Sequence, residues 1–400
     1  MATYARNCRD ALAQAVLLAL WSVAGCGAGD KARVADLPTW SVVEEFRLGS
    51  VDDPETALTR VPPVYGLTIG PQGHIYIAQP VDGQIRIYDE SGRFLRAVGR
   101  KGNGPGEFAN LWFIGFVADT LYAINWVPGR VSFFTLEGEH LGTQALAVAP
   151  DDRFVPTGPF MLLPDGTAVV SPGNASVAQR SITHRPYLRI DRSGRIIDTL
   201  AMIPTAGEGL LFTRGRVTVS LFHPFRDYPL IAIDPRGERM AVVERRAARD
   251  TGDASFVVTE MSLRGDTLYS RRYPYRPVPV PSQLADSLVE SIIGSLTSGS
   301  WTRSEAERDV REALEVPKYL RPVSDVRYAA DGTLWIAREP YSTPTQLWQV
   351  HDRNGEPLAF VRLPAGIDVP LIQGDAVWAV VQDELGVPYV VRYRVQRQTR

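Results

Sequence analysis

The chain has few of the residues that most often mark a chemical site. Its 400 residues include only two cysteines and five histidines. No histidine stands in the His-x-His or His-Glu-x-x-His spacing that is typical of metal sites, and no Gly-x-Ser-x-Gly elbow is present. We therefore assign no catalytic residue and no metal ligand, and we predict no cofactor.

An excess of charge of one sign is also missing. Lys and Arg number 43 against 45 Asp and Glu, so the net charge is −2. A general nucleic-acid binder carries a basic surface that attracts phosphates, so we expect no nucleic-acid partner. Long apolar runs are scarce as well. The run at residues 11–23 is shorter than the about 20 residues that span a bilayer as a helix.

This short apolar run predicts an export signal. Arg6 and Arg9 precede it, as in the charged first part of a signal peptide. The Val-Ala-Gly-Cys tetrapeptide that ends at Cys26 resembles the bacterial lipobox, in which cleavage before the cysteine is followed by lipidation. Cys8 would leave with the signal, and lipidation would account for the lone remaining cysteine. The alternative is an ordinary signal peptide whose cleavage site lies beside a cysteine.

The lipobox resemblance implies an order of segments and a location. We predict a signal peptide at residues 1–25 and a lipidated tether at residues 26–39. Gly27, rather than Asp, follows Cys26. By resemblance to the sorting rule of Gram-negative lipoproteins, this favours the outer membrane. The expected location is the bacterial cell envelope, with the membrane as a partner through the lipid on Cys26.

Glycine and proline, at 34 and 30 residues, are plentiful and punctuate a repeat. In its first unit, strands are expected at residues 63–69, 74–78, 84–89 and 93–98, with tight glycine turns after the first and third strands. Alternating branched and aromatic residues support the strand assignment. Four strands joined in this way form one antiparallel sheet.

The same pattern returns along the chain, at residues 112–141, 159–201, 229–272 and 323–363. A sixth unit from Asp368 has only three strands, and a spare strand stands at residues 40–48. Pairing this strand as the outer strand of the last unit would close a ring. Periodic four-stranded units are typical of a β-propeller, so we predict an all-β, six-bladed propeller over residues 40–397. Unrelated hairpins in a sandwich are the alternative.

Two segments do not fit the repeat. Residues 209–221 are either an insertion or misassigned blade strands. Residues 282–316, between the fourth and fifth units, predict two short amphipathic helices because Leu284, Leu288, Ile292 and Leu296 recur every four residues. Ser304 and Glu307 predict a capping box for the second helix. We expect both helices to pack on the adjoining propeller face, or to form a lid over a central pocket.

The stretch from Gly99 to Phe108 contains four glycines and reads Gly-Arg-Lys-Gly-Asn-Gly-Pro-Gly-Glu-Phe. It resembles the linker of NHL-type repeats, and residues 40–397 resemble bacterial six-bladed β-propeller lipoproteins that share this loop. That resemblance implies the fold and adds little chemistry. A phosphate-binding loop is not expected because no Lys-Ser/Thr pair and no helix follow. We predict a linker between the first two blades, with Phe108 packed between their sheets.

Loop lengths predict which face carries a site. The turns within the first and last strand pairs of each blade are tight and share one face. Longer connections share the other, where function usually lies. The candidate binding residues on that face are Trp126, His184, His223, Arg226 and Tyr341. Packing between blades is the alternative explanation for each of them.

These observations favour a binding or scaffolding module rather than an enzyme. The expected ligand is an unidentified protein, peptide or carbohydrate at the bacterial cell envelope. The alternative is a propeller hydrolase or lyase. By resemblance to calcium-dependent lactonases and amidating lyases, such an enzyme would hold calcium or zinc on Asp, Asn, Glu or His side chains near the central channel.

Overall fold

The computed structural model describes residues 37–127, 129–174, 183–204, 209–250, 252, 254–338 and 344–397. The chain divides into two compact units, Met1–Leu37 and Pro38–Arg400, and the fold below is that of the second unit. The predicted signal peptide, and Cys26 with the tether up to residue 36, lie outside the described residues. Neither of the two described helices has the length and hydropathy that a membrane span requires.

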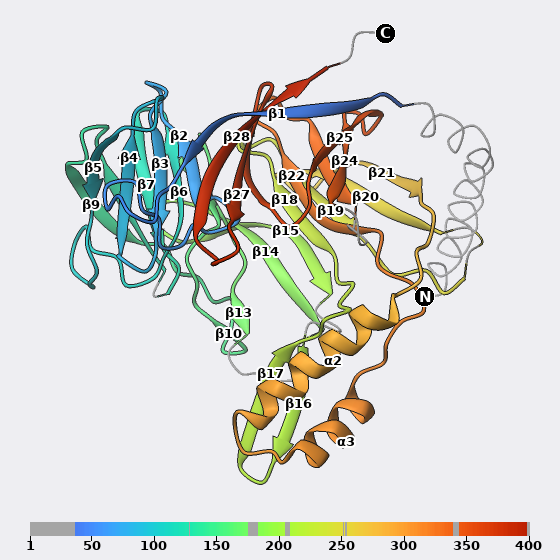
Figure 1. The fold of residues 1–400 in the computed structure, drawn as a ribbon. Coiled ribbons are helices and arrows are strands. Elements are labelled where there is room, and N and C mark those ends of the chain that lie inside the picture. Colours follow the sequence, from blue (N-terminus) through green and yellow to red (C-terminus); the bar gives the residue numbers. More distant parts are fainter. Residues whose placement is uncertain are drawn as a thin grey trace, which may run out of the picture. The chain divides into compact units, whose positions relative to one another are not determined.

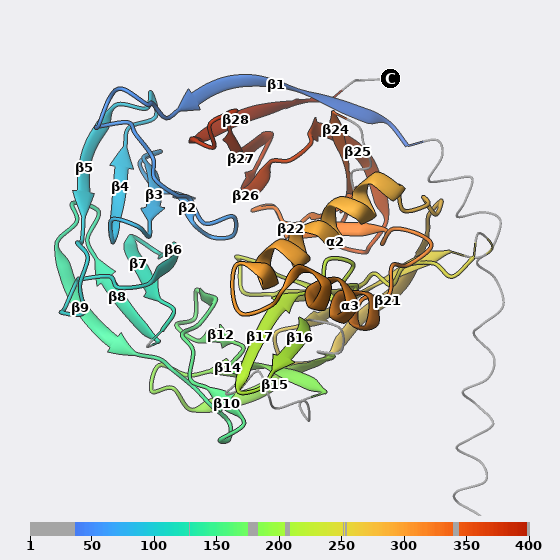
Figure 2. The same ribbon diagram turned by 60° about the horizontal axis from the view of Figure 1, so that its bottom comes forward.

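Antiparallel four-stranded blades follow one another around a ring (Figures 1 and 2). From the inner to the outer strand, the first two blades are β2 (Leu67–Ile69), β3 (Ile75–Gln79), β4 (Gln84–Tyr88), β5 (Phe94–Val98), and β6 (Leu111–Val117), β7 (Thr120–Asn125), β8 (Arg130–Phe134), β9 (His140–Ala145). The next two are β11 (Met161–Leu162), β12 (Ala168–Val170), β14 (His184–Ile190), β15 (Ile196–Pro204), and β18 (Leu230–Ile233), β19 (Arg239–Glu244), β20 (Ser255–Ser262), β21 (Thr267–Pro274). The last two are β22 (Val323–Tyr328), β23 (Leu334–Arg338), β24 (Thr345–His351), β25 (Pro357–Pro364), and β26 (Asp368–Gln373), β27 (Ala376–Gln382), β28 (Pro388–Gln396), β1 (Thr39–Leu48). The predicted all-β propeller is thus confirmed.

The N-terminal strand β1 closes the ring in the predicted way. It pairs antiparallel with β28, from Ser41 opposite Gln396 to Leu48 opposite Val390. One detail differs from the expectation, because Thr39 and Trp40 also pair in parallel with β25. Strand β1 therefore joins the last two blades into one eight-stranded sheet.

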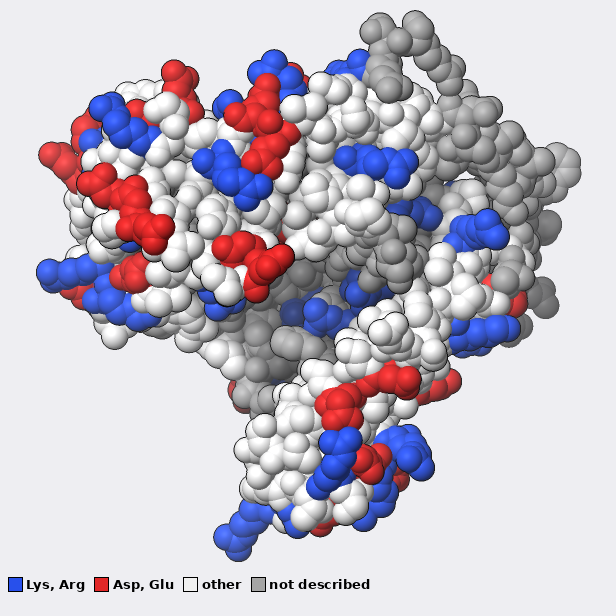
Figure 3. Space-filling view, in the orientation of Figure 1, with Lys and Arg blue, Asp and Glu red and all other residues white. Residues whose placement is uncertain are grey.

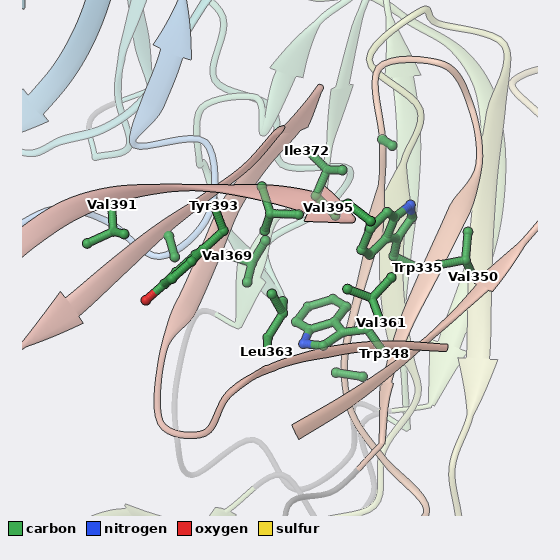
Figure 4. Close-up of a cluster of buried hydrophobic side chains, with 14 residues drawn as sticks. Trp335, Trp348, Val350, Val361, Leu363, Val369, Ile372, Val391, Tyr393 and Val395 are labelled. Carbon is green, nitrogen blue, oxygen red and sulfur yellow. The ribbon is translucent and has the colours of Figure 1, made fainter. Parts of the chain in front are cut away.

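Apolar side chains fill the spaces between neighbouring blades. Between the fifth and sixth blades, Trp335 and Trp348 face residues of β28 such as Val391 and Tyr393 (Figure 4). Between the first and second blades, Phe108 is fully buried and packs on Phe134 at a ring distance of 5.9 Å. The predicted role of Phe108, as an apolar plug at the end of a glycine-rich linker, is confirmed.

A lobe projects from the ring at one face (Figure 1). It consists of the hairpin β16 (Gly209–Arg214) and β17 (Val217–Phe222) with the helices α2 (Ser282–Thr297) and α3 (Arg303–Ala313). Its apolar core is built from both segments, and its fully or largely buried members are Leu210, Phe212, Ile292, Ile293, Leu296, Trp301, Ala306, Val310 and Leu314. The helical stripes therefore cover the hairpin, and the prediction that they pack on the propeller face is wrong. The hairpin is an insertion and not a pair of blade strands.

The start of α3 also differs from the prediction. Thr302 is the N-cap and forms the capping box with Glu305, whose backbone N–H and carboxylate both bond to Thr302. The predicted partner pair lies two residues further on. Glu307 instead pairs with Arg303 at 2.8 Å on the helix surface, so it is not available to cap Ser304.

Both segments of the lobe leave the ring between the outer strand of one blade and the inner strand of the next. The hairpin lies between β15 and β18, and the helices between β21 and β22. The two arms that carry the helices pair with each other, since Val280 N–H donates to Lys318 O and Leu320 N–H to Val278 O. The small bridge of β10 (Phe154–Val155) with β13 (Gly173–Asn174) occupies connections of the same kind. The elaborated connections thus share one face of the ring.

Candidate functional site

The inner strands of all six blades surround a cavity of about 470 Å³ in the middle of the ring. It extends from Tyr65, in the loop that enters β2, to Pro235 and Ala330, in the turns that follow β18 and β22. The lining is predominantly apolar. Its members with larger apolar or aromatic side chains are Tyr65, Leu67, Trp112, Phe113, Ile114, Phe116, Tyr122, Phe160, Met161, Leu162, Tyr187, Ile231, Ile233, Val326, Tyr328 and Leu371.

Aromatic rings form the wall that the second and third blades contribute. Phe113 on β6 and Phe160, next to β11, lie 5.8 Å apart between ring centres. Phe160 stacks on Tyr187 of β14 at 5.9 Å with an interplanar angle of 11°. Rings in offset or edge-on contact hold one another in place and present flat faces to a ligand. This wall is suited to a planar apolar molecule.

Tyr65 reaches into the cavity from the first blade. Its ring meets Phe113 edge-on at 6.0 Å, and its hydroxyl donates to Ile233 O of β18 at 3.5 Å. Its backbone is in the left-handed region, with φ 52°, which is uncommon for a residue other than glycine. Burial raises the pKa of the Tyr65 hydroxyl, and the nearby Arg327 charge opposes this rise.

The conformation of Tyr65 corrects one strand boundary. The sequence predicts a strand over residues 63–69, but β2 begins at Leu67 and the four residues before it form a loop. Pro62 and Pro63 lack the N–H groups that a ladder needs. Gly66 lies so close to Pro62 that an added Cβ would meet its oxygen at 2.5 Å. The loop therefore turns inward instead of extending the blade.

Arg327 is the single charged residue among the described residues that line the cavity. Its Nε donates to Val369 O at 3.0 Å and its Nη1 to Val326 O at 3.0 Å. Nη1 also pairs with a carboxylate oxygen of Asp325 at 2.7 Å. Its side chain is 16% exposed, so the guanidinium is held between the fifth and sixth blades with little contact to water.

Two carboxyl groups stand beside this guanidinium. Burial raises the pKa of Asp325, whereas Arg327 lowers it; Asp368, at the start of β26, adds a further upward effect. Burial likewise raises the pKa of Asp368 and Arg327 opposes it. Both carboxyl groups thus take up a proton at higher pH than an ordinary aspartate.

The residues predicted from loop lengths do not gather at one place. Trp126 stands behind the cavity wall, with its ring 5.3 Å from Phe113 and 4.9 Å from Phe160. His184 is exposed at the start of β14, where its Nδ1 contacts the Thr183 hydroxyl. Within the described ranges, no hydrogen bond or ring contact links Trp126, His184 and His223.

His223 and Arg226 share one turn next to the lobe. Arg226 N–H donates to His223 O at 3.2 Å, and the Arg226 guanidinium lies over the Tyr228 ring at 5.0 Å. Burial lowers the pKa of His223, opposed by Asp227. Tyr341 lies outside the described residues. Ligand binding by these residues stays a prediction.

A metal site finds no support in the described part of the chain. No group of three or more His, Cys, Asp or Glu side chains there is arranged to hold a metal ion. The glycine-rich linker is occupied by its own contacts. Glu107 accepts from Gly104 N–H at 2.8 Å and pairs with Arg100 at 2.6 Å, which closes the loop on itself.

The lining residues Phe113, Phe160, Tyr187 and Arg327 were not singled out from the sequence. They belong to strands, where an aromatic residue has the same pattern as a core residue. A signal was present in Arg327, because a charged residue within a largely apolar inner strand calls for a partner. The ring closure that brings the inner strands together is not visible in any single repeat.

The fold and the cavity define this chain as a β-propeller protein. It resembles the six-bladed propellers, because a family model described as a 6-bladed beta-propeller matches residues 70–166. This match covers the first two blades and the start of the third. No curated protein sequence matches the chain.

Several solved structures are similar to this chain in fold. A Bacteroides fragilis protein described as exported has 11% identity and a TM-score of 0.48, with 90% of this chain and 99% of that chain covered. A gluconolactonase from Xanthomonas campestris has 10% identity and a TM-score of 0.41, with 89% and 97% covered. Virginiamycin B lyase from Staphylococcus aureus has 12% identity and a TM-score of 0.38, with 87% and 98% covered. At such low identity these likenesses carry no information on activity.

Proposed function

We propose that this chain is an exported binding protein of the bacterial cell envelope that takes up a small aromatic ligand in its central cavity. The observation that carries the proposal is the aromatic wall of Phe113, Phe160 and Tyr187 in a cavity of about 470 Å³. Ligand pockets commonly have roughly 300–1,000 Å³ and an apolar lining with a few polar groups. The cavity has this size and this composition.

A binding role agrees with the chemistry of the lining. Apolar and aromatic side chains supply burial and stacking but cannot transfer a proton at neutral pH or attack a substrate. The tyrosine hydroxyls are poor acids here, because burial raises the pKa of Tyr65 and of Tyr122. The alternative of a metal-dependent hydrolase or lyase has no comparable observation in its favour.

The envelope location rests on the sequence. The proposed lipid anchor is Cys26, preceded by the signal peptide and followed by the tether that leads to β1. Expression in a Gram-negative host, with metabolic labelling by a fatty acid, tests it. The Cys26→Ser variant should lose the label and leave the membrane fraction. Unchanged membrane retention of the variant would refute the anchor, but would leave the ligand proposal standing.

Binding of a neutral aromatic probe tests the cavity. N-phenyl-1-naphthylamine should bind the purified chain with one site, seen as a saturable increase in its fluorescence. Phe160→Leu keeps an apolar side chain but removes the central ring of the aromatic wall, so it should weaken binding about tenfold, as expected for the loss of one to two kcal/mol of ring contact. Phe94→Leu is the matched control, since Phe94 is also partly buried and contacts one ring, Tyr88, away from the cavity. Absence of saturable binding, or equal loss in both variants, would contradict the proposal.

A further inference from the structure

The cavity combines an extensive apolar lining with one fixed positive charge. Arg327 is the charged member, and its guanidinium is oriented by bonds to Val369 O and Val326 O. A buried charge costs free energy unless hydrogen bonds and opposite charges compensate it. The position of Arg327 in a ligand-sized cavity therefore calls for an explanation beyond the stability of the ring.

The existing contacts leave part of the guanidinium unused. Nε has one acceptor, and Nη1 has Val326 O and the Asp325 carboxylate. No residue in the described ranges accepts a hydrogen bond from Nη2. An arginine with a fixed plane and free N–H groups is suited to a planar acceptor such as a carboxylate.

Since the cavity also has a stacking wall, we propose that its ligand is an aromatic carboxylate, with the ring on Phe113, Phe160 and Tyr187 and the carboxylate on Nη2 of Arg327. This inference rests on the proposed function and names the ligand class of the same cavity. The Arg327 charge also acts on the Tyr65 hydroxyl, which places that hydroxyl near the same end of the ligand.

The surrounding charges favour one negative charge over two. Asp325 neutralises part of Arg327, and Asp368 lies close enough to interact with both. A further arginine, Arg245, also interacts with Asp325 and holds Val323 O at the start of β22. A phosphate dianion would meet the two aspartates, whereas an ammonium group would meet the Arg327 charge in the cavity wall. A carboxylate monoanion avoids both conflicts.

Three naphthalene compounds of the same size test the ligand class: 2-naphthoate, 2-naphthamide and 2-naphthylmethylamine. Isothermal titration at pH 7.5 should show that the native chain binds the carboxylate roughly tenfold to hundredfold more tightly than the amide, as expected for a charged hydrogen bond. The amine should bind more weakly than the amide. Equal binding of carboxylate and amide would overturn the carboxylate inference while the proposed function stands. Failure of all three compounds and of the neutral probe would refute the proposed function itself.

Substitution of the arginine assigns the preference to its source. Arg327→Gln should lower the affinity for 2-naphthoate to that for 2-naphthamide, and should leave amide binding within about twofold of the native value, as expected when only the charged contact is lost. Arg327→Lys, which keeps the charge but not the planar fork, should retain part of the preference. Arg362→Gln, an exposed arginine of β25, is the matched control and should change neither affinity. If Arg327→Gln keeps the full carboxylate preference, the inference is wrong. Circular dichroism and amide binding establish that each variant is folded.

Discussion

Single buried groups determine how this propeller responds to pH. His351, at the end of β24, is fully buried and meets the Tyr273 ring at 4.6 Å. Its Nδ1 lies 3.3 Å from Gly355 O. Burial lowers the pKa of His351 to about 4, because the charged imidazolium is poorly solvated between the fourth and fifth blades. The folded state therefore holds this histidine neutral at pH values where an unfolded chain protonates it.

This difference predicts acid sensitivity. The pKa of His351 is lower in the folded chain than its usual value of 6.5, so the unfolded chain binds the proton first. Stability is complete above about pH 6.5 and falls as the pH decreases toward 4, by at most about 3 kcal/mol. Urea unfolding at pH 7.5, 5.5 and 4.5 measures the loss. His351→Asn keeps a donor for Gly355 O without a titrating group, and should flatten the pH dependence over this range. His184→Asn, which changes an exposed histidine, controls for the substitution, and an equally flat profile for it would contradict the assignment.

A second residue-scale prediction concerns the carboxyl groups beside Arg327. Burial raises the pKa of Asp325 and of Asp368, so both gain protons as the pH falls from neutral. Protonation removes negative charge next to the guanidinium, whereas Arg327 and Arg245 stay charged. The affinity for 2-naphthoate should therefore rise from pH 7.5 to 5.5, and that for 2-naphthamide should stay constant. Asp368→Asn should strengthen binding at pH 7.5 and reduce its pH dependence. A carboxylate affinity that is independent of pH in the native chain would exclude this coupling.

At the scale of elements, the ring depends on how its first strand is attached. Leu48, at the end of β1, is 4% exposed and packs in the core between the sixth and first blades. That core contains Trp378 and Val390 from one side and Ile75 and Ile77 from the other. Strand β1 thus does more than complete a sheet, because its last residue also seals the seam between the blades that the chain must join.

Substitutions on β1 separate these two contributions. Leu48→Ala should lower the free energy of unfolding by about 2–5 kcal/mol, as is usual when a buried leucine is truncated. Val43→Ala, on the same strand but 45% exposed, should change it by no more than about 0.5 kcal/mol. Chemical denaturation of both variants gives the two values. Similar costs would show that strand pairing, rather than the seam, carries the contribution of β1.

The linker between the first two blades shows what local sequence predicts well. Gly99 has φ 81°, and an added Cβ would lie 2.4 Å from the Phe108 ring, so glycine is required there. Such constraints act over ten residues and are visible in one repeat. The blade turns are of the same kind, which is why the propeller and its closing strand were predictable.

At the scale of the whole molecule, the contacts that were missed join distant parts of the chain. The hairpin residue Leu210 and the helix residue Leu296 share one core although 86 positions separate them in the numbering. Nothing local links these segments, so the amphipathic helices were assigned to the wrong surface. The cavity was missed for a related reason, because Phe113, Phe160 and Arg327 become neighbours only when the ring closes.

The lobe is built as a structural unit beside the ring. Its core shares no residue with the cores between the blades, within the described part of the chain. Its surface carries Lys/Arg and Asp/Glu side by side (Figure 3). Examples are Arg303, which pairs with Glu290 at 2.9 Å, and Arg214, which pairs with Glu305 at 2.9 Å. Exposed ion pairs contribute little stability, so the lobe depends on its apolar core.

Local unfolding of the lobe is the last prediction. Leu296 is fully buried in the lobe core, and Leu296→Ala should cost about 2–5 kcal/mol, most of it within the lobe. Hydrogen exchange, followed by mass spectrometry, should accelerate in residues 209–222 and 282–314 and stay native-like in the blades. Binding of the aromatic probe should persist, because every residue that lines the cavity belongs to the ring. The matched control is Leu363→Ala, an equally buried leucine between the fifth and sixth blades, which should accelerate exchange in the ring instead. Faster exchange in β2–β5 of the Leu296 variant would show that the lobe and the ring unfold as one cooperative unit.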